Sequence, residues 1–169
     1  LTVMADNMST GSALLAENNV VITEDMSVIL GENASIYQFR VLENASVDKD
    51  VTVQMCGSQY SSMPNQAHIV RSKAASKNYT IGGDLTVIQM TGHWEQLYCV
   101  EEDANVNGNV TVSIQEGSLM NLTGIKGASI GGDFRLTTGE TVEFTGKGYV
   151  YGCQGTVSGD YEFTINNAN

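Results

Sequence analysis

Basic residues are scarce in this chain. Its 169 residues include eight Lys and Arg against nineteen Asp and Glu, which gives a formal net charge of −11. Nucleic acids and anionic membrane surfaces are bound through clusters of Lys and Arg. The composition therefore argues against both classes of partner.

Proline, tryptophan, cysteine and long apolar runs are also rare. The chain has one proline, Pro64, and one tryptophan, Trp94. No apolar run approaches the roughly 18 residues of a membrane-spanning helix, so we expect no membrane insertion. The three cysteines are Cys56, Cys99 and Cys153, and an odd number gives no disulfide framework. We expect free, mostly buried thiols.

The chain is rich in internal repetition. Short segments that alternate apolar and polar residues recur along it, with steps of 25, 25, 34, 25, 24 and 27 residues. Their first residues are Leu1, Met26, Val51, Leu85, Val110, Phe134 and Tyr161. A period near 25 residues is typical of a solenoid, in which each repeat buries its apolar face against its neighbours.

The pattern within each repeat indicates strands. Residues 51–55, 110–114 and 161–165 alternate and are rich in Val, Ile, Thr and aromatic residues, as expected of strands with one buried face. A strand, a crossover helix and their loops need about 30 residues or more, so the repeat is too short for an α/β unit. We therefore predict an all-β, single-stranded parallel β-helix of about six coils of about 25 residues, right-handed by the general rule for parallel connections.

The alternation also predicts which side chains point inward. The inward set is Val51, Val53, Met55, Leu85, Val87, Val110, Val112, Ile114, Phe134, Leu136, Tyr161, Phe163 and Ile165. One outward column should contain Thr2, Ser27, Thr52, Thr86, Thr111, Arg135 and Glu162. A regular Thr column could order water at an ice surface, but the neighbouring outward column mixes apolar and polar residues. Ordinary strand propensity explains the threonines better.

Two columns of turn residues precede these segments. Four of six copies carry a glycine two positions before the segment, which predicts positive φ there: Gly83, Gly108, Gly132 and Gly159. The next position always carries Asp or Asn: Asp25, Asp50, Asp84, Asn109, Asp133 and Asp160. The five aspartates could bind calcium between coils. The favoured alternative is that each side chain accepts a backbone N–H in the turn, a role that Asn109 can fill without charge.

The 34-residue step marks an insertion of about nine residues. We place it at residues 57–65, a stretch rich in Ser, Gln and Met, as a surface loop in one coil. Residues 1–169 otherwise form one β-solenoid domain without an internal boundary. The first segment starts in mid-strand and no capping repeat is evident, so we expect the chain to be part of a longer protein.

One cluster has the residue types of a carbohydrate site. His93, Trp94 and Glu95 are adjacent, and Tyr98 follows closely. An aromatic ring beside carboxylates can hold a sugar, and two carboxylates can hydrolyse a glycosidic bond. A lone tryptophan is more often a packing anchor, and the few basic residues disfavour a catalytic groove. We expect His68 to be an ordinary strand or loop residue.

Residues 81–87 (IGGDLTV) and 106–112 (VNGNVTV) resemble the β-helical repeats of large bacterial surface proteins and adhesin-like proteins. The resemblance covers residues 22–165 and implies an extracellular or cell-surface module, without catalytic activity, that acts as a stalk or binding face in adhesion. It implies as partners a host or environmental glycan or protein and flanking domains of the same polypeptide, and no cofactor beyond the calcium considered above. The alternative is a carbohydrate-active β-helix enzyme of the glycoside hydrolase or polysaccharide lyase type.

Overall fold

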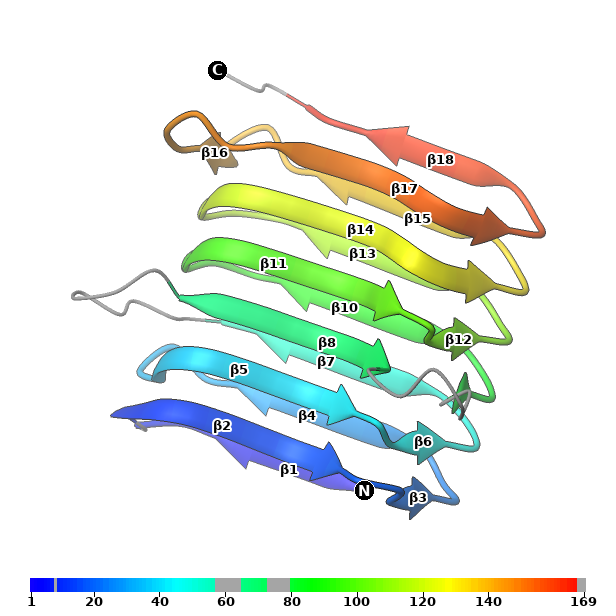
Figure 1. The fold of residues 1–169 in the computed structure, drawn as a ribbon. Coiled ribbons are helices and arrows are strands. Elements are labelled where there is room, and N and C mark those ends of the chain that lie inside the picture. Colours follow the sequence, from blue (N-terminus) through cyan, green and yellow to red (C-terminus); the bar gives the residue numbers. More distant parts are fainter. Residues whose placement is uncertain (8, 57–64, 73–79, 167–169) are drawn as a thin grey trace.

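The computed structural model is a stack of β-coils (Figure 1). It describes residues 1–7, 9–56, 65–72 and 80–166. Every regular element in these ranges is a strand, and all strand pairs are parallel, with about six turns of about 25 residues. The predicted parallel β-solenoid is confirmed. No helix long and apolar enough to cross a bilayer occurs in the described ranges.

The alternating segments of the sequence form one seven-stranded sheet. Its strands, in spatial order, are β1 (Thr2–Ala5), β4 (Met26–Leu30), β7 (Val51–Met55), β10 (Leu85–Gln89), β13 (Val110–Ile114), β15 (Phe134–Thr138) and β18 (Tyr161–Thr164). Each coil contributes one strand, and consecutive coils are neighbours in space (Figure 1).

The rest of each coil forms an eleven-stranded sheet. Its path is β2 (Ser9–Glu17), β5 (Ser35–Glu43), β8 (Gln66–Ser72), β11 (His93–Glu102), β14 (Ser118–Ile130), β12 (Asn105–Val106), β9 (Thr80–Ile81), β6 (Ser46–Val47) and β3 (Val21–Ile22). Two further strands, β16 (Glu143–Phe144) and β17 (Val150–Val157), pair with β14. The thirteen-residue β14 joins the long and the short strands, because it pairs with β11 along most of its length and with β12 at its end.

The core runs along the stack as columns of apolar side chains. From Val51 to Leu136, every residue predicted to point inward is buried. Tyr161 is 47% exposed, because no described coil packs on its far side, although its ring stacks on Phe134 with centroids 5.5 Å apart. Phe163 and Ile165 are only partly buried for the same reason.

The predicted outward column is also confirmed. The pairing register runs from Thr2 through Thr52 and Thr111 to Arg135 and Glu162 without a shift. Arg135 Nε lies 3.7 Å from Glu162 Oε2 in the neighbouring strand. This column is therefore regular, and four of its seven residues are threonine.

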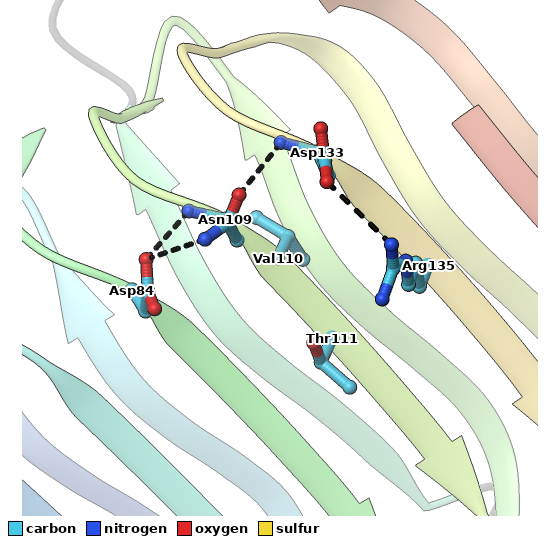
Figure 2. Close-up of a pocket in the computed structure, with 6 residues that line it drawn as sticks. All are labelled: Asp84, Asn109, Val110, Thr111, Asp133 and Arg135. Carbon is cyan, nitrogen blue, oxygen red and sulfur yellow. Dashed lines mark hydrogen bonds and ion pairs between the residues drawn. The ribbon is translucent and has the colours of Figure 1, made fainter. Parts of the chain in front are cut away.

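The column of Asp and Asn residues that precede the strands, here called the Asx column, forms a hydrogen-bonded ladder along the stack. Figure 2 shows the part from Asp84 to Asp133. Each Asx Oδ1 accepts the backbone N–H of the Asx one coil further on. The Asp84 N–H donates to Asp50 at 2.8 Å, the Asn109 N–H to Asp84 at 2.7 Å, and the Asp133 N–H to Asn109 at 2.9 Å. The ladder joins successive coils, whereas the sequence predicted acceptance within the same turn.

The neighbouring glycines correct a prediction. Gly83, Gly108, Gly132 and Gly159 are absent from the residues with positive φ. A Cβ at any of them would instead collide with the Asx side chain of the preceding coil. Lys49 occupies the same position in an earlier coil, and there the ladder bond from the Asp50 N–H to Asp25 lengthens to 3.3 Å. Glycine is therefore needed for close approach between coils.

The register also relocates the insertion. Met26 pairs with Val51 and Gln38 with Gln66, so three extra residues lie before β8. Val47 pairs with Ile81, so six more lie between Gln66 and β9. The prediction that placed all nine within 57–65 is wrong in this respect. Residues 57–64 themselves, like 73–79, lie outside the described residues.

Candidate functional site

The long strands carry three columns of polar side chains on their outer face. Each column follows the pairing register of β5, β8, β11 and β14. The first is an amide column of Gln38, Gln66, Gln96 and Asn121; the second contains Arg40, His68, Tyr98 and Thr123; the third contains Glu43, Arg71, Glu101 and Lys126. We call the part of this surface formed by β5, β8, β11 and β14 the polar face.

The sequence explains why these side chains face outward. On either side of the middle column lie buried apolar residues, such as Phe39 and Val41 beside Arg40 in β5. Each long strand then places two buried residues in succession, Ile69 and Val70 in β8 and Cys99 and Val100 in β11. This double step interrupts the alternation and leaves the charged third column outside the core.

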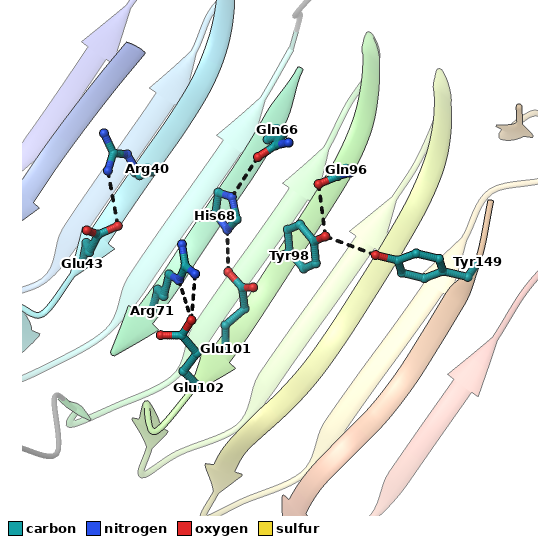
Figure 3. A network of polar contacts seen from close by, with 10 residues as sticks. All are labelled: Arg40, Glu43, Gln66, His68, Arg71, Gln96, Tyr98, Glu101, Glu102 and Tyr149. Carbon is teal, nitrogen blue, oxygen red and sulfur yellow. Dashed lines mark hydrogen bonds and ion pairs between the residues drawn. The ribbon is translucent and has the colours of Figure 1, made fainter. Parts of the chain in front are cut away.

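His68 lies at the centre of the polar face (Figure 3). Its Nδ1 is 2.6 Å from Glu101 Oε2, and its Nε2 is 3.4 Å from Gln66 Oε1. The His68 ring stacks on Tyr98 with centroids 4.9 Å apart and planes inclined by 8°. The side chains of His68 and Glu101 are only 11% and 6% exposed. Packing and hydrogen bonds therefore hold both groups in one geometry.

Tyr98 extends the network toward the next coils. Its hydroxyl donates to Gln96 Oε1 at 3.1 Å and lies 3.1 Å from the Tyr149 hydroxyl. Burial, first, and then the hydrogen bond with Tyr149 raise the pKa of the Tyr98 phenol. Tyr98 is therefore a neutral hydrogen-bonding group at physiological pH.

Arg71 and Arg40 are both paired with carboxylates. Nε and Nη2 of Arg71 donate to Glu102 Oε1 at 2.9 and 2.7 Å (Figure 3). Burial lowers the pKa of Arg71, but the hydrogen bond with Glu102 and the surrounding carboxylates raise it by more. Arg40 Nη1 is 3.4 Å from Glu43 Oε2. Both guanidinium groups are held in place by these pairs.

These columns enclose a groove of about 330 Å³. Its lining contains three glutamines, His68, Tyr98, three cations and one carboxylate, that of Glu101. Two more aromatic rings lie beside the polar face, since Tyr151 of β17 pairs with Thr123 of β14 and Tyr149 comes just before β17. Tyr149 and Tyr151 are 38% and 42% exposed, with ring centroids 4.7 Å apart. The groove thus offers hydrogen-bond donors, acceptors and aromatic surface together.

The carbohydrate cluster predicted from the sequence is not assembled as expected. Trp94 is fully buried and packs against Phe39, with ring centroids 6.2 Å apart, so it presents no surface to a ligand. His93 and Glu95 lie on the outer side of β11, where His93 Nδ1 is 2.7 Å from Ser118 Oγ and Nε2 is 3.5 Å from Glu95 Oε1. Of the four residues, only Tyr98 lines the groove.

His68 corrects a second expectation, because it is the centre of the network and not an ordinary strand residue. Its partner Glu101 is 33 residues away in sequence. The sequence feature that indicates this face is the recurrence of glutamine, once per coil, on the outward side of the long strands, at Gln38, Gln66 and Gln96. The 34-residue step obscured that spacing.

The aspartates of the Asx column remain the candidates for calcium. In each ladder bond an Oδ1 atom already accepts a backbone N–H. Among the described residues, no three His, Cys, Asp or Glu side chains come together in a group that could hold a metal ion.

We predict that calcium does not bind to this column, because the ladder uses one carboxylate oxygen of Asp25, Asp50, Asp84 and Asp133 to join the coils. Titration of the protein with calcium chloride in a calorimeter should give only the heat of dilution. Asp84→Asn, which retains the accepting oxygen, is the matched control for charge. A saturable isotherm in the wild type that weakens in Asp84→Asn would contradict the prediction.

Comparison of the chain with protein-family models, with curated proteins and with solved structures finds no match.

Proposed function

We propose that this protein is a non-catalytic β-solenoid module of a bacterial surface protein that binds a carbohydrate through its polar face. The observation that carries the proposal is the groove, in which amides, a phenol and guanidinium groups are fixed beside aromatic rings. Sugars are bound through hydroxyl groups, which both donate and accept hydrogen bonds, and through ring faces that stack on aromatics. The extracellular bacterial setting is supported by the resemblance of the repeats and by the acidic composition.

Preorganisation is what makes the polar face suitable for binding. Fixing a flexible side chain on association costs about 0.5–1.5 kcal/mol. In the free protein, Tyr98 is already held by Gln96 and Tyr149, and Arg71 by Glu102. The conformational entropy of these side chains is therefore already lost on folding, and binding a ligand costs less.

The alternative function is that of a carbohydrate-active enzyme. The His68–Glu101 pair favours it, because an imidazole oriented by a carboxylate is the arrangement of a general base and its positioning partner. Two observations weigh against it: the pair is largely buried, and the raised pKa of Tyr98 beside it makes the phenol a weak proton donor, poorly suited to act as the general acid. Binding without turnover is therefore favoured.

A glycan array with the wild-type chain tests the proposal, followed by calorimetry on the best ligand. Gln96→Ala should weaken binding by about tenfold or more, since one lost hydrogen bond of about 1.4 kcal/mol has that effect. Gln54→Ala is the matched control, because Gln54 lies in β7 of the other sheet. It should change the dissociation constant less than about twofold.

The outcomes separate the functions. Binding that is lost in Gln96→Ala and retained in Gln54→Ala supports the proposal. Release of shortened oligosaccharides during incubation, abolished in His68→Ala, would establish the enzyme instead. No binding on the array, or equal losses in both glutamine variants, would overturn the proposal.

A further inference from the structure

The distribution of cations indicates which carbohydrates the groove would take. The whole chain has eight Lys and Arg, and three of them, Arg40, Arg71 and Lys126, line this one groove. Glu101 is the single carboxylate in the same lining, although acids outnumber bases by nineteen to eight in the chain. The groove therefore gathers an unusual share of the cations of a strongly acidic protein.

Lys126 differs from the two arginines because its charge is not paired. Arg40 and Arg71 form ion pairs with Glu43 and Glu102. Within the part of the chain that the structure describes, Lys126 makes no hydrogen bond or ion pair, and it is exposed. It is the one cation of the groove that is available to a ligand.

The reason Lys126 lacks a partner is found in the neighbouring strand. Lys126 pairs in register with Glu101, the position at which opposite charges on adjacent strands normally attract one another. Glu101 instead directs its carboxylate to His68 of β8, on the opposite side, at 2.6 Å (Figure 3). The His68–Glu101 contact thus leaves the Lys126 ammonium open at the edge of the groove.

We propose that the polar face binds a carbohydrate that carries carboxylates, and that Lys126 pairs with one of them. This inference rests on the function proposed above and specifies its ligand. Lys126 lies three residues along β14 from Thr123, the neighbour of Tyr98 and Tyr151. At about 3.3 Å per residue this separation is at most about 10 Å. One oligosaccharide can therefore place a ring on the tyrosines and the carboxylate of another unit on Lys126.

The net charge of the protein does not oppose such a ligand at physiological salt. Charges further away than the Debye length, about 8 Å at 0.15 M, are largely screened. The ligand therefore responds mainly to the charges in and beside the groove, where the two arginines are neutralised by their partners and Lys126 is not. Because the Lys126 contact is exposed, its contribution should decrease as salt is added.

The test uses trigalacturonate and the same trisaccharide with its carboxyl groups reduced to alcohols. Calorimetry at about 0.15 M salt should show about fivefold tighter binding of the acid, a difference of about 1 kcal/mol, as expected of one exposed ion pair. Lys126→Gln should remove most of this preference by weakening the binding of the acid more than that of the reduced trisaccharide. Lys49→Gln is the matched control, since Lys49 lies in a turn before β7 and pairs with Glu24; it should retain the preference.

Equal binding of both trisaccharides, with the loss in Gln96→Ala retained, would overturn this inference and leave the proposed function standing. A preference for the acid that survives Lys126→Gln would also overturn it. If neither trisaccharide binds while a different, neutral glycan binds at the polar face, galacturonate-type ligands are excluded and the inference is contradicted. Absence of binding to any glycan would overturn the inference and the proposed function together.

Discussion

Replacing Gly108 by alanine is expected to reduce the free energy of unfolding by about 2–3 kcal/mol, the upper part of the range for inserting atoms into a packed site. A Cβ at this position would collide with Asp84 Oδ1 and lie 2.7 Å from the carbonyl carbon and oxygen of Gly83. Relief of the collision would move the coils apart and lengthen the 2.7 Å bond between the Asn109 N–H and Asp84. Urea denaturation followed by circular dichroism measures the loss.

Gly11→Ala is the control for the same chemical change. Gly11 lies in β2, and a Cβ there would meet no atom within 4 Å. Its stability should change by no more than about 0.5 kcal/mol, or increase slightly because alanine restricts the unfolded chain. Equal losses in both variants, or no loss in Gly108→Ala, would contradict the close approach between coils.

The second large effect is expected for Trp94→Ala, which should cost about 3–5 kcal/mol of stability. Among the described residues, Trp94 is the largest fully buried side chain, and it packs against Phe39 of β5, two strands away from β11 in the sheet. Alanine would leave a cavity that the stacked coils cannot close without losing their register. Thermal and urea unfolding should both show the destabilisation.

Trp94→Phe separates packing from ligand contact. Phenylalanine keeps a ring against Phe39 and removes an indole N–H that has no acceptor among the described residues. We expect a cost below about 1.5 kcal/mol and unchanged affinity for glycans. A Trp94→Ala protein that is as stable as the wild type but no longer binds glycans would instead restore Trp94 as a ligand-binding residue.

The repeat could be predicted from the sequence because the physical constraint acts at each position separately. Residues such as Val51, Leu85 and Val110 occupy one column, and each must be apolar to be buried between neighbours. The Asx position is equally constrained, since each side chain must accept the N–H of the next coil. Constraints of this kind recur with every coil and so appear as a period.

The polar face could not be predicted in this way, because its contacts join residues that lie far apart in sequence. Gln38 and Gln66 become neighbours only when the three extra residues before β8 are placed correctly. Trp94 points inward because the inward–outward alternation of β11 is interrupted, with Glu95 and Gln96 both on the outer side. Strict alternation does not predict such an interruption, so the sequence did not show that Trp94 is buried.

The recurring glycine of the turn is visible in the sequence, but the physical reason for it is not. Gly83 and Gly108 recur because the preceding coil approaches closely, and a sequence alone does not distinguish this from a need for positive φ. Lys49 provides the internal comparison, since the coil that carries a side chain there has the longest bond of the ladder. The distinction required the distances between coils.

The most direct test of the central claim, that ligand binds at the polar face, is chemical-shift mapping of the isotope-labelled protein with the strongest oligosaccharide of the array. The shifted amides are expected to lie in β8, β11 and β14, around His68, Tyr98 and Lys126, while the amides of β7, β10 and β13 in the other sheet stay unchanged. Shifts concentrated on the threonine-rich sheet, or at the ends of the stack, would contradict it.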